Sequence, residues 1–431
     1  MSTPEFDGYK VDHLFLLIGE NPLPNYVAAN LLLNKGGTAY LIHTTDTEKS
    51  AKRLQKILKS ELNGFKDVEL RSLGDYESDA FHIQKKIREE LEKIKSGKIG
   101  LNYTGGTKAM AVHGYKAAFA NRSDTIFSYL DPRRLEMCID REDRERQCLK
   151  VKPEILPVKL VKVFQIHGWS WNSDPVDVPE LPETAKAFAV FHSEGELVKL
   201  WRKWCNEVLR EKTRNNKGRW LTEKQLTNVD VEGLSLELLK SQTKIQKALM
   251  LLDLPAETLF LNTIKQKGLR NLEKVCEWLD GEWLEHYVLQ QVQAISKQNH
   301  IHDSAASFWI KNPNNPSKTK FQFDVAFMRG YQLFAISCTT IDRKSDCKQK
   351  LFEAYIRAQQ LGGSEARVAL VCCASSEDIE ELRTEITNVL KAEPENERKD
   401  YKIQVFGREH LTNLSQEIAD WIAQNDWESS K

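Results

Sequence analysis

Residues Leu101–Ala120 read Leu-Asn-Tyr-Thr-Gly-Gly-Thr-Lys-Ala-Met-Ala-Val-His-Gly-Tyr-Lys-Ala-Ala-Phe-Ala, and the fold class follows from them. The pattern predicts a strand at 98–103, a turn at 104–108 and an alanine-rich helix at 109–120. Paired glycines at a strand-to-helix turn allow a ligand to approach the backbone closely. The helix start that follows offers unpaired N–H groups and the positive end of the helix dipole. With the threonine hydroxyls and the lysine of the turn, these groups suit a phosphate-bearing ligand.

Two familiar phosphate-binding motifs are excluded. The Walker A loop needs Ser or Thr after its lysine, whereas Lys108 is followed by Ala109. The dinucleotide fingerprint Gly-x-Gly-x-x-Gly is also absent from the turn. The alternative is that Gly105 and Gly106 simply make a tight corner between strand and helix, and the turn alone does not separate the two interpretations.

Composition bounds the class of protein. The chain has 431 residues, enough for about three domains. Lys plus Arg and Asp plus Glu both number 62, so any nucleic-acid-binding surface must be local. We expect no membrane span and no signal peptide. None of the eight cysteines forms a Cys-x-x-Cys pair, so we expect neither a zinc knuckle nor a disulfide framework, and a cytoplasmic location.

Strands and helices alternate along the first third of the chain. This alternation predicts an α/β fold with a parallel sheet covered by helices on both faces. Ligands bind beyond the carboxyl ends of the strands in such sheets. The loops 19–25, 44–47 and 104–108 all follow predicted strands, so we expect them to share one rim. The predicted strands are 13–18, 38–43, 68–73 and 98–103, closed by a pair at 124–130 and 135–139.

Three segments of this part carry a resemblance to a known family. They are Gly-Glu-Asn-Pro-Leu-Pro-Asn at 19–25, Asn-Tyr-Thr-Gly-Gly-Thr-Lys-Ala-Met at 102–110 and Ser-Tyr-Leu-Asp at 128–131. Together they resemble a Rossmann-like CARF domain, the ligand sensor of type III CRISPR ancillary proteins, at about 1–150. The resemblance implies a homodimer that binds cyclic oligoadenylate, most often the tetra-adenylate, across its two-fold axis. The predicted ligand contacts are Glu20, Asn21, Asn25, Thr44, Thr104, Gly105, Gly106, Thr107 and Lys108.

The middle of the chain, 151–270, is predicted to be a linker and a small helical module. We expect extended connectors at 151–164 and a linker through 168–175. Tryptophans at helical spacing, Trp201 and Trp204, favour a packed core over a base-stacking surface. A winged-helix nucleic-acid binder is the alternative for this module.

The C-terminal part, 271–431, resembles the PD-(D/E)xK restriction-endonuclease-like domain that is fused to CARF in cyclic-oligoadenylate-activated nucleases. The expected order is a helix carrying Glu285, a Pro/Asn-linked pair of strands, a hairpin turn at 329–330 and a helix–strand alternation to the C-terminus. The shared segments are Gly281-x-Trp283-Leu284-Glu285, Phe323-Asp324-Val325, Leu333-Phe334-Ala335-Ile336 and Leu361-Gly362-Gly363.

One departure from that family concerns the catalytic strand. The family hairpin usually ends in Glu-Cys-Lys-Thr, whereas this chain has Ser337-Cys338-Thr339-Thr340. A metal carboxylate is thus replaced by serine and the catalytic lysine by threonine. Lys344 or Lys348 is expected to supply the lysine from a migrated position, and Asp342 or Asp346 a carboxylate. The alternative is that these residues form an ordinary solvated helix start.

The sequence therefore predicts a CRISPR ancillary effector in which cyclic oligoadenylate activates Mg²⁺- or Mn²⁺-dependent cleavage of DNA or RNA. The resemblance gives the metal Glu285, Asp324 and the Cys338 carbonyl as ligands. A second hypothesis is a degenerate nuclease domain that binds nucleic acid or a partner without cutting. A third is a ring nuclease, in which the CARF loops themselves cleave the ligand.

Overall fold

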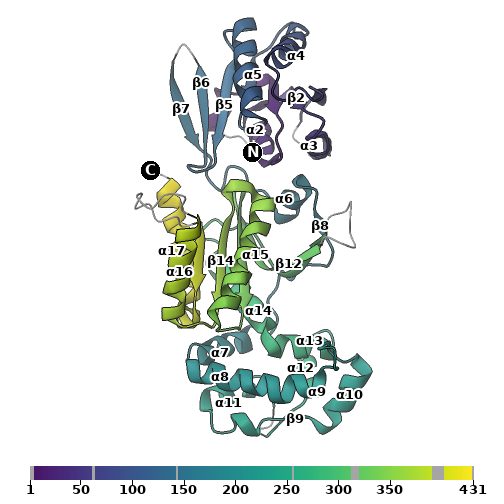
Figure 1. Ribbon diagram of the computed structural model, residues 1–431, viewed down its shortest axis with the longest axis vertical. Helices are drawn as coiled ribbons and strands as arrows, with labels where there is room; N and C mark the ends of the chain where they lie inside the picture. The colour runs from purple at the N-terminus through teal and green to yellow at the C-terminus, as the bar shows by residue number, and fades with distance from the viewer. Residues whose placement is uncertain are drawn as a thin grey trace.

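The computed structural model describes residues 4–60, 64–141, 144–254, 257–311, 320–390 and 402–429. The chain forms three parts stacked along one axis (Figure 1). The N-terminal sheet domain lies at one end, the C-terminal sheet domain in the middle and the helical module at the other end. Among the described residues, no helix combines the length and apolar character needed to cross a membrane.

The N-terminal domain contains a seven-stranded sheet of order β3-β2-β1-β4-β5-β6-β7. Strands β1 to β5 run parallel to their neighbours, and β6 and β7 close the sheet antiparallel. Apolar residues cover both faces, which explains the continuous hydrophobic runs of the parallel strands. The strands are β1 (Val11–Leu17), β2 (Leu33–His43), β3 (Asp67–Ser72), β4 (Ile99–Asn102), β5 (Ile126–Asp131), β6 (Glu136–Arg141) and β7 (Arg144–Lys150).

Helices connect these strands as the alternation predicts. The first two long helices pack with the core that continues into the C-terminal domain, and the last two pack on the opposite face. Their bounds are α2 (Leu23–Leu32), α3 (Glu48–Ser60), α4 (Ala80–Glu92) and α5 (Lys108–Asn121), after the short α1 (Pro4–Asp7).

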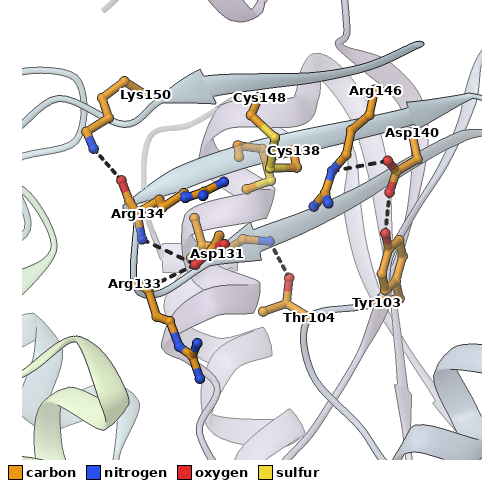
Figure 2. Close-up of a disulfide and its surroundings, with 12 residues drawn as sticks. Tyr103, Thr104, Asp131, Arg133, Arg134, Cys138, Asp140, Arg146, Cys148 and Lys150 are labelled. Carbon is orange, nitrogen blue, oxygen red and sulfur yellow. Dashed lines mark hydrogen bonds and ion pairs between the residues drawn. A yellow bond between two sulfur atoms is a disulfide. The ribbon is translucent and has the colours of Figure 1, made fainter. Parts of the chain in front are cut away.

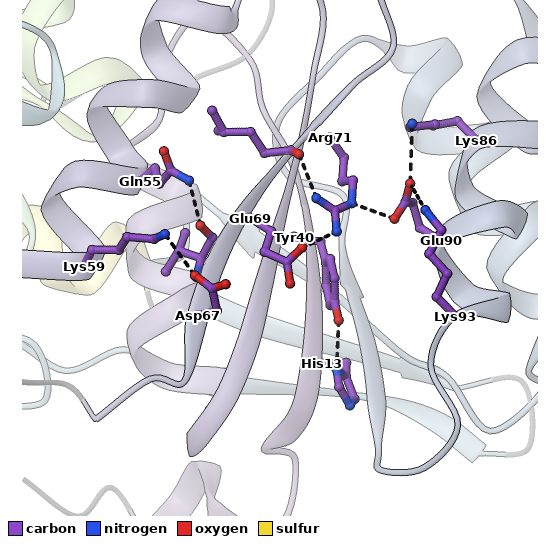
Figure 3. Close-up of polar contacts among 12 residues, drawn as sticks. His13, Tyr40, Gln55, Lys59, Asp67, Glu69, Arg71, Lys86, Glu90 and Lys93 are labelled. Atoms are coloured by element: carbon purple, nitrogen blue, oxygen red, sulfur yellow. Dashed lines mark hydrogen bonds and ion pairs between the residues drawn. The ribbon is translucent and has the colours of Figure 1, made fainter.

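A buried carboxylate holds α4 against the sheet (Figure 3). Glu90 of α4 is only 2% exposed and accepts a 2.6 Å hydrogen bond from Arg71 of β3. Lys93 and Lys86 lie 2.8 Å and 3.4 Å from the same side chain. A buried charge is tolerated only when it is paired in this way, so α4 is fixed beside α5 and the turn that precedes it.

Strand β7 and its disulfide correct the sequence-based expectation. Cys148 of β7 lies directly opposite Cys138 of β6, and the two form a disulfide (Figure 2). The polar composition of 144–150 concealed the strand, because one that is exposed at a sheet edge needs no apolar alternation. The expected absence of disulfides was wrong because a tight hairpin brings together two cysteines that are ten residues apart.

The segment predicted as connector and linker belongs partly to the C-terminal domain. Residues 160–166 form helix α6 (Leu160–Ile166) rather than an extended connector. Strand β8 (Ser170–Trp171) then pairs antiparallel with β11 (Asp303–Lys311) and becomes the edge of the C-terminal sheet. A two-residue strand leaves no periodic signal, so sequence reasoning had no means of finding it.

The helical module shares one core with the C-terminal sheet. Trp201 and Trp204 are buried in this core, which confirms that they are core residues rather than surface platforms. The described sheet of the module is limited to the two-residue strands β9 (Leu234–Ser235) and β10 (Thr258–Leu259). The principal helices are α7 (Pro182–His192), α8 (Gly195–Trp204), α10 (Glu223–Glu232), α11 (Thr243–Met250), α12 (Leu261–Lys265) and α13 (Leu272–Glu277).

The C-terminal domain has a six-stranded sheet of order β15-β14-β13-β12-β11-β8. The pairs from β11 to β13 are antiparallel, and those from β13 to β15 are parallel. The Pro/Asn turn expected before β12 lies outside the described residues. The remaining elements are α14 (Trp283–Ala294), β12 (Lys320–Arg329), β13 (Gln332–Thr339), α15 (Lys344–Gly362), β14 (Arg367–Cys372), α16 (Ser376–Leu390), β15 (Ile403–Phe406) and α17 (Leu414–Ser429).

Candidate functional site

The three loops predicted to form a ligand rim do share one edge. Strands β2, β1 and β4 are consecutive parallel neighbours, so their carboxyl ends lie side by side. The loops 44–47, 19–25 and 104–108 continue directly from those ends. The rim therefore follows from strand order, as the alternation of strands and helices predicted.

Glycines bring two of these loops into contact. A Cβ atom at Gly105 would lie 2.3 Å from the carbonyl oxygen of Leu17, a distance that no side chain can occupy. Gly106 has a φ of +75°, which L side chains rarely adopt. A Cβ at Gly19 would lie 3.0 Å from the Gly106 nitrogen. The paired glycines thus do make a tight corner, and that corner leaves backbone at the surface of the rim.

The hydroxyl groups of Thr104 and Thr107 form hydrogen bonds within the protein that fix the conformation of the turn. Thr107 caps α5, since its Oγ1 accepts from the Met110 N–H at 3.1 Å, and the same hydroxyl donates to the Glu77 carbonyl at 2.6 Å. Thr104 Oγ1 accepts from the Leu130 N–H at 2.7 Å (Figure 2). Lys108 is exposed at the first position of α5, where its charge and the helix dipole favour an anion.

Among the other residues that were predicted to contact the ligand, Asn25 and Thr44 are buried and Glu20 is exposed. Asn25 is buried and donates to the Leu17 carbonyl at 2.9 Å, so it supports the floor under Gly105. Thr44 is buried, and its hydroxyl lies 3.1 Å from that of Thr47. Glu20 is exposed on the loop between β1 and α2. Direct ligand contact by these residues stays a prediction.

Asn21 is directed towards the C-terminal domain, which sequence reasoning missed. Its Oδ1 lies 3.0 Å from Nε2 of His167, which follows α6. A Cβ at Gly363, at the end of α15, would lie 2.0 Å from Asn21 Nδ2. Gly363 also has a φ of +64°, so the Leu361-Gly362-Gly363 segment ends where the rim loop touches the second domain. A sequence feature that could have indicated this contact is the Gly362-Gly363 pair, because paired glycines often mark a close approach of the backbone.

The second site lies on the C-terminal sheet around two carboxylates. Glu285 projects from α14, and the hydroxyl of Ser307 on β11 donates to its Oε2 at 2.7 Å. Asp324 on β12 accepts from the Ser337 hydroxyl at 2.9 Å and from the Cys338 N–H at 2.8 Å. The structure therefore brings the two predicted acids together, with Ser337 bonded to one of them.

An irregularity in β11 adds a residue that the sequence did not reveal. Ser307 has a φ of +52°, and the regular pairing of β11 with β12 skips it between Ala306 and Phe308. Such left-handed residues in strands cost free energy and persist at functional sites. This distortion directs the Ser307 hydroxyl to Glu285, and no local sequence pattern signals it.

The electrostatics of this site favour a cation. Burial raises the pKa of Glu285 well above its ordinary value, and the charge of Asp324 raises it further. Burial also raises the pKa of Asp324, while Lys350 and the hydrogen bonds from Cys338 and Ser337 oppose the rise. Two carboxylates that repel each other in a buried site are stabilised when a cation neutralises them.

The lysines predicted to have migrated face another helix. Lys344 pairs with Glu381 and Glu385, and Lys348 pairs with Glu385 at 2.7 Å, both on α16. Lys350 lies beside Asp324 instead, in the wall of a cavity of about 340 Å³. Glu353 lines the same cavity one helical turn later. A catalytic role for Lys344 or Lys348 stays a prediction, and Lys350 is the lysine of the same helix that lines the cavity beside Asp324.

The donor set suits a divalent cation that keeps several waters. Mg²⁺ is commonly held by one or two carboxylates plus water, and Glu285 and Asp324 supply two. Among the described residues, the one cluster of three or more potential His, Cys, Asp or Glu ligands is Glu136 with Cys138 and Cys148, whose sulfurs are joined in the disulfide. The nuclease-like site thus fits Mg²⁺ or Mn²⁺ better than a metal that requires a complete protein cage.

The two sheets and their sites define a CARF sensor joined to a restriction-endonuclease-like domain. The family model described as the Card1 CARF domain matches residues 14–155, and that of the Card1-like endonuclease domain matches residues 272–425. The chain belongs to the family of proteins that join these two domains. The expected fold class is confirmed. A comparison with curated proteins finds no match.

Two solved structures are similar along nearly the whole chain. The crystal structure of protein VC1899 from Vibrio cholerae has a TM-score of 0.65 at 16% identity, covering 96% of this chain and 98% of its own. The structure of Can2 from Sulfobacillus thermosulfidooxidans in complex with cyclic tetra-adenylate also has a TM-score of 0.65, at 15% identity, covering 95% and 99%. At such identities the likeness establishes the fold.

Proposed function

We propose that this protein is a homodimeric nuclease that is activated by cyclic oligoadenylate and depends on a divalent metal. The observation that carries the proposal is the pair of mutually repelling acids, Glu285 and Asp324, on the same chain as a CARF rim. The family membership supports ligand binding and an endonuclease domain. The Can2 structure, which contains cyclic tetra-adenylate, supports that ring as the activator.

At the rim, the ligand phosphates would meet backbone N–H groups of the Gly105–Gly106 turn, the start of α5 and Lys108. A ring with two-fold symmetry can be bound equally by two identical loops, so the dimer interface would be isologous. One ring should therefore bind per dimer. Calorimetric titration of cyclic tetra-adenylate tests this, and a stoichiometry of one ring per chain would contradict it.

At the nuclease site, Glu285 and Asp324 would hold Mg²⁺ or Mn²⁺, which supplies Lewis-acid polarisation of the scissile phosphate and an activated water. Ser307 orients the Glu285 carboxylate through its 2.7 Å hydrogen bond. Lys350 takes the place of the missing strand lysine and stabilises the charge that develops on the phosphate. Glu353, on the same face of α15, is positioned to replace the carboxylate lost at Ser337.

The contact of Asn21 with His167 and Gly363 offers a route between the two sites. Asn21 belongs to the rim loop, and Gly363 ends the helix that carries Lys350. A shift of the rim loop on ligand binding would act directly on that helix end. The physical requirement is a ligand that binds one arrangement of this contact more tightly than the other.

The hydrogen bond between Ser337 and Asp324 supports a second candidate function, a nuclease-like domain that binds without cutting. A hydroxyl that donates to Asp324 at 2.9 Å occupies one of its acceptor positions without adding negative charge for a metal. A domain altered in this way would bind nucleic acid or a partner protein under ligand control without cutting.

One experiment separates these candidates. Labelled DNA and RNA are incubated with wild type and Asp324→Asn, with and without each cyclic oligoadenylate, in Mn²⁺ or in chelator. The nuclease proposal expects cleavage by wild type alone, only with ligand and metal. Equal cleavage by both proteins would refute the site, and an inert wild type that still binds ligand and nucleic acid would establish the second candidate. Linear adenylate products that persist in chelator would indicate a ring nuclease instead.

A further inference from the structure

The antiparallel hairpin of β6 and β7 carries a group of metal-binding side chains that neither of the two sites uses. Glu136 and Cys138 are two residues apart on β6, so their side chains lie on the same face of the sheet. Cys148 lies directly opposite Cys138 on β7 (Figure 2). A carboxylate oxygen of Glu136 and the two sulfur atoms all lie within 4.8 Å of one another. Three donor atoms of the kinds that bind zinc therefore meet at one place on the hairpin.

The spacing of these atoms suits a tetrahedral ion once the two sulfurs are separate thiolates. In this structure the sulfurs are bonded to each other, and zinc is bound by the thiolate form of cysteine. Two thiolates that each lie about 2.3 Å from a tetrahedral zinc ion are roughly 3.8 Å apart. That separation is within the 4.8 Å spread of the donor atoms, so small side-chain rotations are sufficient to form the site.

The disulfide is accessible to a reductant from one side. Cys138 is only 2% exposed, whereas Cys148 is exposed on the edge strand β7. A thiolate of a dithiol reductant attacks the Cys148 sulfur, the S–S bond breaks, and the Cys138 sulfur leaves as a thiolate. The second thiol of the reductant then displaces the Cys148 sulfur. The reductant supplies two electrons and becomes a disulfide, and the protein gains two thiols whose protons are released when a metal binds.

The charges on this face of the hairpin favour thiolates and a thiophilic metal. Arg146 and Lys150 each lie two residues from Cys148 on β7, on the face that carries its side chain. Neighbouring cations favour the thiolate form of a cysteine. Two thiolates and one carboxylate carry three negative charges, which a divalent ion reduces to one. Because Mg²⁺ and Mn²⁺ prefer oxygen ligands, this donor set selects zinc instead.

We propose that reduction of the Cys138–Cys148 disulfide opens a zinc site, in which two thiolates and the Glu136 carboxylate bind the ion and water takes the fourth position. The disulfide and the zinc ion each join β6 to β7, so the hairpin stays closed in either redox state. This hairpin also contacts the second domain, because Lys150 Nζ donates to the Ser429 carbonyl on α17 at 2.8 Å. The inference is independent of the proposed cleavage, since none of the three ligands belongs to the rim or to the nuclease-like site.

The test uses full-length protein that is reduced with a phosphine and desalted without oxygen. It is titrated with Co²⁺, whose bonds to thiolates give a charge-transfer absorption band that oxygen ligands do not give. The band should saturate at one Co²⁺ per chain, disappear when Zn²⁺ is added, and be absent from the oxidised protein. Cys148→Ser should abolish the band, and Glu136→Gln should weaken Co²⁺ binding by at least about tenfold.

Glu145→Gln is the matched control, because it removes an exposed carboxylate from β7, and it should bind Co²⁺ normally. Glu136→Gln keeps both cysteines, so its effect is measured in a protein that still forms the disulfide. Equal affinity of these two variants would overturn the three-ligand site. A reduced protein without the band, or a band that survives Cys148→Ser, would also overturn it. The cleavage assay in Mn²⁺ tests the proposed function separately, and its failure would leave the zinc site standing.

Discussion

The CARF rim and the nuclease-like site differ in the chemical groups that they present. The rim presents backbone and small side chains, and the one lysine of its three loops, Lys108, is exposed at the start of α5. The nuclease-like site has carboxylates whose pKa values are raised by burial, and the charge of Asp324 raises the pKa of Glu285 further. An exposed rim can bind an anion and release it, whereas the acids have an unfavourable interaction that a bound cation would relieve. We therefore predict that substitutions at the nuclease-like site lower the cleavage rate far more than they lower the affinity for cyclic oligoadenylate.

The largest effect is expected from Lys350. Lys350→Ala should lower ligand-activated cleavage about 100-fold, because it removes the cation beside Asp324 that offsets charge on the phosphate. Lys348→Ala is the matched control, since Lys348 pairs with Glu385 of α16, and it should cleave normally. Initial cleavage rates under saturating ligand decide between them. A larger loss of rate in Lys348→Ala than in Lys350→Ala would instead assign the catalytic role to Lys348.

Restoring the family strand extends the same comparison. Ser337→Glu with Thr339→Lys should lower the metal concentration needed for cleavage, because it adds a third negative charge beside Asp324. If Lys350 already supplies the lysine, Thr339→Lys alone should change the rate little. A revertant that cuts while wild type is inert would show that the natural domain is degenerate.

A smaller effect is expected at the rim. Lys108→Ala should weaken cyclic tetra-adenylate binding about tenfold, the loss typical of one charge-assisted hydrogen bond. The maximal cleavage rate at saturating ligand should stay unchanged, because Lys108 lies outside the nuclease-like site. Calorimetry gives the affinity, and the cleavage assay gives the rate. Unchanged affinity would remove Lys108 from the rim.

Backbone packing at the rim gives the next prediction. Gly105→Ala should lower the free energy of unfolding by about 1–3 kcal/mol and impair ligand binding, because its Cβ would lie 2.3 Å from the Leu17 carbonyl. Gly8→Ala is the control, since no atom lies within 4 Å of the added Cβ. Chemical denaturation monitored by circular dichroism measures both. Equal stability of the two variants would contradict the close approach.

The smallest effect concerns pH and metal in the absence of nucleic acid. The raised pKa values of Glu285 and Asp324 mean that the folded protein keeps protons that the unfolded chain loses. Stability should therefore fall as pH rises above about 4, the ordinary range of these groups, towards the raised values. Glu285→Gln should flatten this dependence by on the order of 1 kcal/mol. Mn²⁺ should raise the thermal midpoint of wild type and leave that of the variant unchanged.

The sequence by itself determined the architecture of the rim and the identity of the two acids. Alternating strands and helices specify a parallel sheet, and parallel strands place their following loops on one edge. The Gly105–Gly106 turn could be found because each of its properties is local to a few residues. Glu285 and Asp324 were found because each lies within a short segment that resembles the nuclease family.

The tertiary structure alone decided which side chains reach these sites. Lys348 and Lys350 are two residues apart, which separates them by roughly 200° around a helix, so the packing of α15 on the sheet chooses between them. Ser307 enters the site through a distorted strand, and Asn21 faces Gly363 across the domain boundary. Cys138 and Cys148 meet because the polar edge strand β7 pairs with β6. These contacts join residues that are distant in sequence or depend on which face packs inward, so no local pattern encodes them.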